Sequence, residues 1–98
     1  MEELAAAEEA QKIIDTLSVT SPDTPTIVDT LRRAYDQARR ATTPILSIAG
    51  ALNASRDEVV LALNGLIGSL QARSLTAENI DRAKAAVDVW IKLLKGRS

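Results

Sequence analysis

Hydrophobic positions recur at helical spacing along most of the chain, and breaker residues divide this pattern into segments. In residues 2–18 the apolar positions fall three and four residues apart, which is the period of a helix with one buried face. These positions are Ala6, Ala10, Ile13, Ile14 and Leu17. Residues 19–25 contain two prolines, Pro22 and Pro25, and are expected to form a loop. The pattern therefore predicts a first amphipathic helix over residues 2–18.

A strong start signal opens the second segment. The side-chain oxygen of Thr24 can cap a helix N-terminus, and Pro25 suits the first helical position, where its missing N–H is not needed. The apolar stripe behind it consists of Ile27, Leu31, Ala34, Ala38 and Ala41, and polar residues fill the rest. Because Pro44 disfavours a helical Thr43, this most cleanly amphipathic helix is expected to end or kink near residue 43.

The remaining signals predict three further helices. Thr43 can cap a short, almost wholly apolar helix over residues 44–52, and Asn53-Ala54-Ser55 is expected to break it. Ser55 with Glu58 matches a capping box for a helix that runs to about residue 73. A last helix is expected over residues 77–95, with Thr76 as N-cap and Gly96 just after its end. The pattern predicts an all-α fold, a compact bundle of four or five helices with short capped loops.

Composition supports one small globular domain over residues 1–98. Apolar residues make up 46% of the chain and charged residues 26%, which is typical of a folded protein and not of a disordered one. The chain has no Cys and no His. It therefore has no disulfide or thiolate metal site, and it lacks the commonest general base and metal ligand.

Charge is balanced overall but uneven along the chain. The formal net charge is −1, so no global field recruits nucleic acid or an anionic membrane. Residues 1–31 hold seven acids and one Lys (net −6), and residues 32–98 hold six acids and eleven bases (net +5). No apolar run reaches the length of about 18 residues that a membrane span needs. The first residues lack the basic region of a signal peptide. A cytoplasmic location, or a recombinant protein with no native compartment, is the expectation.

Catalytic chemistry finds little support in the sequence. Nearly all carboxylates and all four Lys fall on predicted polar faces, where no apolar environment would shift their pKa values. Ser47 and Ser69 lie in apolar runs, but neither has a Lys at turn spacing to activate it. Metal-ligand spacings and glycine-rich phosphate loops are absent from the sequence. We expect a protein that is not an enzyme and that needs no cofactor or metal.

Residues 45–66 resemble a helix-turn-helix, a DNA-binding motif. The matching positions are Ala49 and Leu52 in the first helix, Asn53 in the turn, and Val59 and Ala62 in the second helix. The resemblance implies that Arg56 and Asn64 on the second helix would contact base edges in the major groove. Asp57, Val60 and Leu61 share that face, and a carboxylate repels phosphate, so nucleic acid is a disfavoured partner.

The central segments present more apolar residues than one small core uses. The surplus consists of Leu46, Ala51, Val60 and Leu61. A contiguous apolar surplus usually marks an interface, and two-fold homodimers are the commonest oligomers. The sequence therefore predicts an interface for a protein partner or a second copy.

Glycines inside the predicted helices raise a further alternative. Gly50, Gly65 and Gly68 either allow a neighbouring helix to approach closely or leave room for a bound molecule. The second option predicts a pocket for a small apolar ligand, edged by Tyr35, Ser47, Asn64 and Trp90. Tight helix packing is the simpler expectation, since protein interiors rarely hold voids.

The chain as a whole also resembles a de novo designed helical protein, because caps, propensity and apolar pattern agree along nearly its full length. The interpretation with the widest support is a non-enzymatic helical scaffold or protein-interaction module that self-associates through residues 44–52 and 55–73. Two alternatives stay open: a small-molecule-binding bundle with a pocket near Trp90, and a helix-turn-helix DNA-binding regulator.

Overall fold

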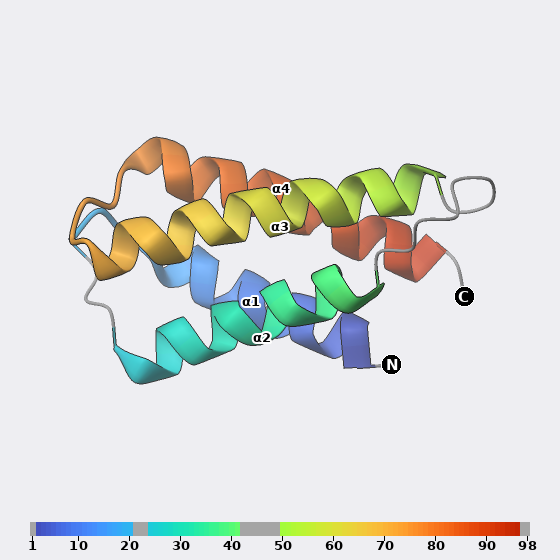
Figure 1. Ribbon diagram of the computed structural model, residues 1–98, viewed down its shortest axis with the longest axis horizontal. Coiled ribbons are helices and arrows are strands. Elements are labelled where there is room, and N and C mark those ends of the chain that lie inside the picture. The colour runs from blue at the N-terminus through green and yellow to red at the C-terminus, as the bar shows by residue number, and fades with distance from the viewer. Residues whose placement is uncertain (1, 21–23, 42–49, 97–98) are drawn as a thin grey trace.

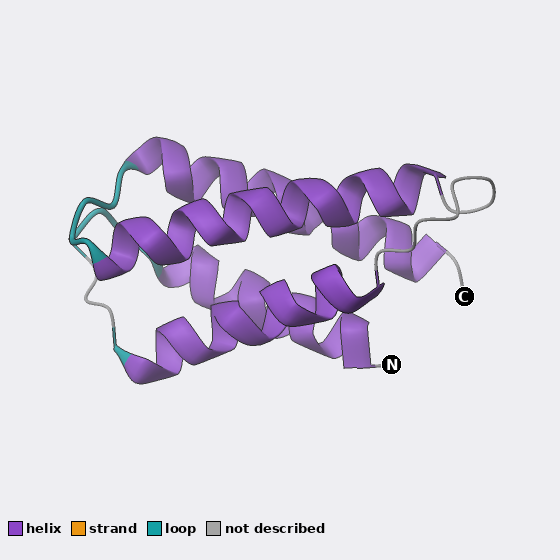
Figure 2. Cartoon of the chain, in the orientation of Figure 1, coloured by secondary structure: helices purple, strands orange, loops and turns teal. Residues whose placement is uncertain are grey.

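The computed structural model describes residues 2–20, 24–41 and 50–96 of the chain. This part of the chain forms four helices and no strand (Figure 2). They are α1 (Glu2–Thr16), α2 (Pro25–Ala41), α3 (Gly50–Gln71) and α4 (Ala77–Gly96). The all-α prediction is confirmed.

The helices form an antiparallel bundle of two layers (Figure 1). One layer holds α1 and α2, the other holds α3 and α4, and both chain ends lie at the same end of the bundle. Each helix packs against its two neighbours, in the pairs α1/α2, α2/α3, α3/α4 and α1/α4. The described residues span 41 × 20 × 19 Å. Consecutive helices are thus spatial neighbours, as short loops require.

Two predicted helix starts are confirmed by their capping bonds. The backbone N–H of Ile27 donates to Thr24 Oγ1 at 3.4 Å, and Pro25 is the first residue of α2. The backbone N–H of Asn79 donates to Thr76 Oγ1 at 3.2 Å at the start of α4. Each threonine therefore satisfies a backbone donor that the first helical turn leaves without a partner.

The C-terminal end of α3 is closed by backbone hydrogen bonds. Ser74 N–H donates to the Ser69 carbonyl at 2.8 Å, and Arg73 N–H donates to the Leu70 carbonyl at 3.1 Å. This pair of bonds is a Schellman motif, in which the residue after the helix takes a left-handed conformation. Arg73 is that residue, with φ of 56°. An arginine therefore stands where glycine is the usual choice.

The predicted break at Asn53-Ala54-Ser55 is wrong. These residues lie inside α3, which is continuous from Gly50 to Gln71. Asn53 and Ser55 are buried there, so tertiary packing overrides their weak helix propensity. The predicted helix over residues 44–52 falls mostly outside the described residues, and its last three residues belong to α3. Residues 50–66 contain no turn of a helix-turn-helix.

The core combines small and large side chains from both layers, and Ile14 on α1 and Leu31 on α2 are among the large ones. The buried faces of α1 and α2 are rich in alanine: Ala6, Ala7, Ala10, Ala34 and Ala38. The largest fully buried side chains of α3 and α4 are Leu63, Leu66, Leu70, Trp90 and Leu94. These large side chains and the smaller alanines together form the core of a chain that has no phenylalanine.

Candidate functional site

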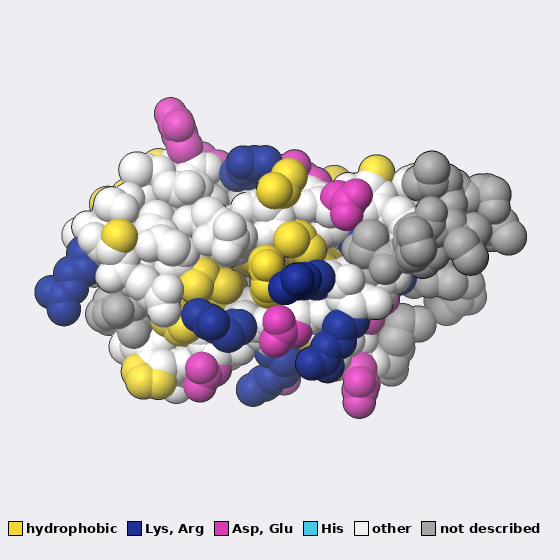
Figure 3. All heavy atoms as spheres, viewed as in Figure 1, with side chains coloured by type: hydrophobic (Ala, Val, Ile, Leu, Met, Phe, Trp, Pro, Cys, Tyr) yellow, Lys and Arg dark blue, Asp and Glu magenta, His cyan; other side chains and the backbone are white. Residues whose placement is uncertain are grey.

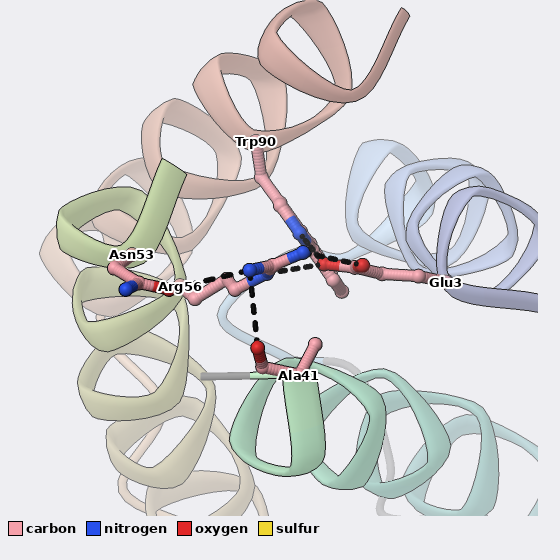
Figure 4. Close-up of polar contacts among 5 residues, drawn as sticks. All are labelled: Glu3, Ala41, Asn53, Arg56 and Trp90. Atoms are coloured by element: carbon pink, nitrogen blue, oxygen red, sulfur yellow. Dashed lines mark hydrogen bonds and ion pairs between the residues drawn. The ribbon is translucent and has the colours of Figure 1, made fainter. Parts of the chain in front are cut away.

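A buried polar network joins all four helices at the end of the bundle where α1 begins and α4 ends (Figure 4). Its members are Glu3 on α1, the backbone carbonyl of Ala41 on α2, Asn53 and Arg56 on α3, and Trp90 on α4. Arg56 is 5% exposed and Trp90 is fully buried. The charged groups of the network are therefore largely removed from water.

The guanidinium of Arg56 lies at the centre of this network. Its Nε and Nη2 donate to the two carboxylate oxygens of Glu3 at 2.8 and 2.9 Å, which is a bidentate pair. Its Nη1 donates to the Ala41 carbonyl at 3.1 Å and to Asn53 Oδ1 at 3.3 Å. The indole Nε1–H of Trp90 donates to Glu3 Oε2 at 2.7 Å. The buried charges are paired and hydrogen-bonded, as burial demands.

This arrangement gives the network a structural role. Arg56 satisfies a carbonyl at the C-terminal end of α2, and Glu3 lies in the first turn of α1, where the helix dipole favours a carboxylate. Arg56, which the helix-turn-helix resemblance would place against DNA bases, instead has its side chain buried and paired with Glu3. The other expected base contact, Asn64, is exposed on α3.

The sequence held a signal for this network that periodicity alone could have shown. Glu3 precedes Ala6, Ala7 and Ala10 by three, four and seven residues, so it continues the buried stripe of α1. Arg56 lies on the buried stripe of α3 in the same way, four residues after Leu52. A buried indole N–H also requires an acceptor. Glu3 and Arg56 are thus charged residues at buried positions of otherwise apolar helical stripes. This pattern is the sequence signal that indicates the network.

Two of the four residues predicted to edge a ligand pocket meet in one groove. Tyr35 on α2 and Asn64 on α3 line an open groove of about 420 Å³ between these helices. Its other walls include Arg32, Asp36, Arg39, Ile67, Gly68 and Gln71. Trp90 is not part of the groove; it lies in the core against Glu3. Ser47 falls outside the described residues. The residues predicted to edge one pocket therefore do not all lie together. The part that is accessible, the groove at Tyr35 and Asn64, is lined by polar and charged residues.

Figure 3 shows this side of the molecule. Hydrophobic side chains gather along the line between α2 and α3, and Lys and Arg side chains lie beside them. Among the groove residues, two arginines stand against one aspartate. The groove therefore carries a net positive charge.

The outer surface of α3 contains most of the predicted interface residues. Leu61 is 59% exposed, although it is a large apolar residue. Ala51 is also exposed, and Val60 is half-buried and packs against the core. Leu46 falls outside the described residues. Among the predicted interface residues that the structure describes, Leu61 is the large apolar side chain that lies on the surface.

A small apolar groove borders this surface between α3 and α4. It has a volume of about 250 Å³ and is lined by Ser55, Glu58, Arg82, Ala85, Ala86 and Val89. Val89 is largely exposed. The hydroxyl oxygen of Ser55 is buried and has no hydrogen-bond partner in the part of the chain that the structure describes. An orphaned buried hydroxyl costs about 1–3 kcal/mol, so its presence beside an open groove calls for an explanation.

An ion pair crosses from α3 to α4 beside this groove. Arg82 Nε and Nη2 donate to the carboxylate oxygens of Glu58 at 2.8 and 3.2 Å. The hydrogen bond from Arg82 lowers the pKa of Glu58, and the positive charge of Arg82 acts in the same direction. This largely exposed pair links α3 to α4 at the surface beside the groove.

The glycines of α3 do not serve close packing within the chain. Among the described residues, a methyl group placed on Gly50 or Gly68 would meet no atom within 4 Å, and one on Gly65 would only touch Asn79 Nδ2 at 3.8 Å. The expectation that these glycines allow neighbouring helices of the same chain to approach closely is therefore wrong. Each interior helical glycine costs about 1 kcal/mol relative to alanine. On the outer surface of α3, no tight contact with another described residue compensates for this loss of stability.

Other kinds of site find no support in the described part of the chain. No group of three or more metal-ligating side chains occurs among residues 2–20, 24–41 and 50–96. None of the four described helices is long and apolar enough to cross a membrane. Comparisons with protein families, curated proteins and solved structures find no match to this chain. Its function must therefore be inferred from its own surfaces and contacts.

Proposed function

We propose that this protein is a non-enzymatic helical interaction module that binds a protein partner through the outer surface of α3 and the bordering groove on α4. The observation that carries the proposal is Leu61, a large apolar side chain that is 59% exposed in the middle of the longest of the described helices. Burying such a side chain contributes about 1.5–3 kcal/mol, so covering it with a partner is favourable.

Leu61 lies directly opposite the buried stripe of α3. With 3.6 residues per turn, it points about 180° away from the stripe that includes Leu52, Leu63 and Leu70. No rearrangement of the core is needed to make it available. Small exposed residues lie on this surface two turns before Leu61 (Ala54) and one and two turns after it (Gly65 and Gly68), with Asp57 between Ala54 and Leu61. A partner backbone can therefore approach α3 closely on both sides of Leu61.

The α3–α4 groove adds a recess to this surface. Ala85, Ala86 and Val89 give it apolar walls, and Ser55 supplies a hydroxyl that lacks a partner. A side chain that enters the groove would bury apolar surface and give this hydroxyl a hydrogen bond. A protruding Leu61 beside a receiving groove is typical of protein interfaces, in which anchor side chains occupy pockets.

Photo-crosslinking tests this proposal whatever the partner is. The photoreactive residue p-benzoylphenylalanine would replace Leu61 in cells that express the chain. Adducts would be resolved by mass and identified by mass spectrometry. The matched control is Val19, which is 55% exposed but lies in the loop after α1. We expect a discrete protein adduct from position 61 and none from position 19. Equal or absent adducts at the two positions would contradict the proposal.

A further inference from the structure

We propose that the partner of this surface is a second copy of the chain, with the two α3 helices packed antiparallel about a two-fold axis at Leu61. This inference rests on the proposed function of the same surface. It adds the identity of the partner, the register of the contact and an ion pair between the copies.

The register is inferred from the sizes of the residues along the outer surface of α3. This surface, called here the outer stripe, consists of Gly50, Ala54, Asp57, Leu61, Gly65, Gly68 and the adjoining Ala72, all exposed. These residues lie at equal steps on the two sides of Leu61: four residues away, seven residues away and eleven residues away. Residues at these steps share one face of any α-helix, and here the residues seven and eleven positions from Leu61 are small on both sides.

An antiparallel two-fold contact uses this symmetry. Residues equally far before and after Leu61 face each other, so Ala54 of one copy faces Gly68 of the other. Gly50 faces Ala72 in the same way. Small residues then oppose small residues at both ends of the contact, and the two Leu61 side chains meet at its centre. The glycines, which no intrachain contact explains, would allow the two backbones to approach closely.

Charge complementarity supports the same arrangement. A two-fold axis brings the α2 side of each outer stripe against the α2 side of the other. Asp57 and Asn64 both lie on this side, about 40° and 60° around the helix from Leu61. Asp57 of one copy therefore lies over Asn64 of the other, and Arg39 lines the groove beside Asn64. The contact places a carboxylate near a guanidinium twice, once for each copy.

Both members of this charge pair are available within a single chain. Asp57 and Arg39 are exposed, and neither forms an ion pair with another described residue. Forming the pair between copies therefore breaks no existing bond. A parallel contact would instead place Asp57 of one copy at the same height as Asp57 and Glu58 of the other, which is repulsive.

Cysteine crosslinking tests the register directly, because the chain has no cysteine of its own. Ala54→Cys and Gly68→Cys are made in separate chains and then mixed under mild oxidation. We expect a disulfide-linked pair in the mixture only. In the antiparallel contact, two copies of position 54 lie about 21 Å apart, which is beyond the reach of a disulfide. Crosslinking of each variant with itself would indicate a parallel contact and overturn the register.

Analytical ultracentrifugation tests the second copy and the ion pair. We expect a concentration-dependent dimer for the wild type and a monomer for Leu61→Asp, with the helical circular dichroism unchanged. Val19→Asp, at a matched exposure, should remain dimeric. Asp57→Arg and Arg39→Asp should each raise the dimer Kd about tenfold, and the double variant should restore it. A wild type that stays monomeric up to about 1 mM would overturn the inference.

The two proposals fail in different ways. A Leu61-dependent dimer whose mixed cysteine variants do not crosslink would overturn the register and leave the binding surface in place. A monomeric pure chain that photo-crosslinks through position 61 to a different protein would overturn the second copy and leave the interaction function in place. Failure of both experiments would remove both proposals.

Discussion

The indole nitrogen of Trp90 lies 2.7 Å from Oε2 of Glu3, so the last helix is hydrogen-bonded to the first turn of the first helix across 87 residues of sequence. The same carboxylate holds the guanidinium of Arg56. One acidic residue near the start of the chain therefore fixes the relative position of α1, α3 and α4. Buried polar groups that are fully bonded are well suited to specify one packing arrangement among several apolar ones.

The Glu3–Arg56 pair should show strong coupling in unfolding experiments. Glu3→Leu leaves the buried guanidinium without its carboxylate, and we expect a loss of about 3–5 kcal/mol in the free energy of unfolding. Arg56→Met leaves the carboxylate with Trp90 alone and should cost a similar amount. The double variant should be more stable than either single variant, because no unpaired charge remains. Urea unfolding followed by far-ultraviolet circular dichroism measures all four chains. Additive losses would contradict the coupling.

Trp90 should report on the integrity of this network through its fluorescence. It is the only tryptophan in the chain and is fully buried. We expect a blue-shifted native emission, weak quenching by acrylamide, and a red shift on unfolding. Small apolar molecules should leave the native emission unchanged, since Trp90 does not line the groove that contains Tyr35 and Asn64. Strong acrylamide quenching of the folded chain would show that the indole is accessible.

The Glu58–Arg82 pair should make a small, pH-dependent contribution to stability. The hydrogen bond from Arg82 lowers the pKa of Glu58 below 4.5, its ordinary value. Because the folded pKa is the lower one, the contribution is present above pH 4.5 and is lost as the pH falls through the folded pKa. The pair is largely exposed, so the effect should be modest. The stability difference between wild type and Glu58→Gln should shrink on acidification. A difference that grows toward low pH would show the opposite sign.

Arg73→Gly should stabilise the chain. Arg73 adopts a φ of 56° in the Schellman motif after α3, a conformation that costs a non-glycine residue about 1–2 kcal/mol. Glycine relieves this strain, but it also raises the conformational entropy of the unfolded chain, which opposes folding. The free energy of unfolding is therefore expected to rise by only about 0.5–1 kcal/mol. Thermal unfolding measures the change. Arg73→Ala, which keeps a Cβ, is the matched control and should bring no such gain.

Local patterns along the chain were sufficient to predict the class of fold and most element boundaries. Helical periodicity, Thr24 with Pro25, and Thr76 were sufficient to place α2 and α4, because these signals act within a few residues of backbone. The apolar stripe of α1 was also evident, although the helix ends at Thr16 and not at residue 18. The exposed Leu61 could be recognised as surplus because it departs from the buried stripe of its own helix.

Whether Asn53 and Ser55 interrupt a helix, and what Arg56 contacts, depends on the packing of the whole bundle. Local propensity favours a break there and a solvent-exposed arginine. The structure instead keeps α3 continuous and pairs Arg56 with Glu3, which is 53 residues distant. It also separates Trp90 from Tyr35 and Asn64. Such contacts depend on which helices become neighbours and at what axial offset. These quantities are set by packing of the whole bundle, and no local stretch of sequence encodes them.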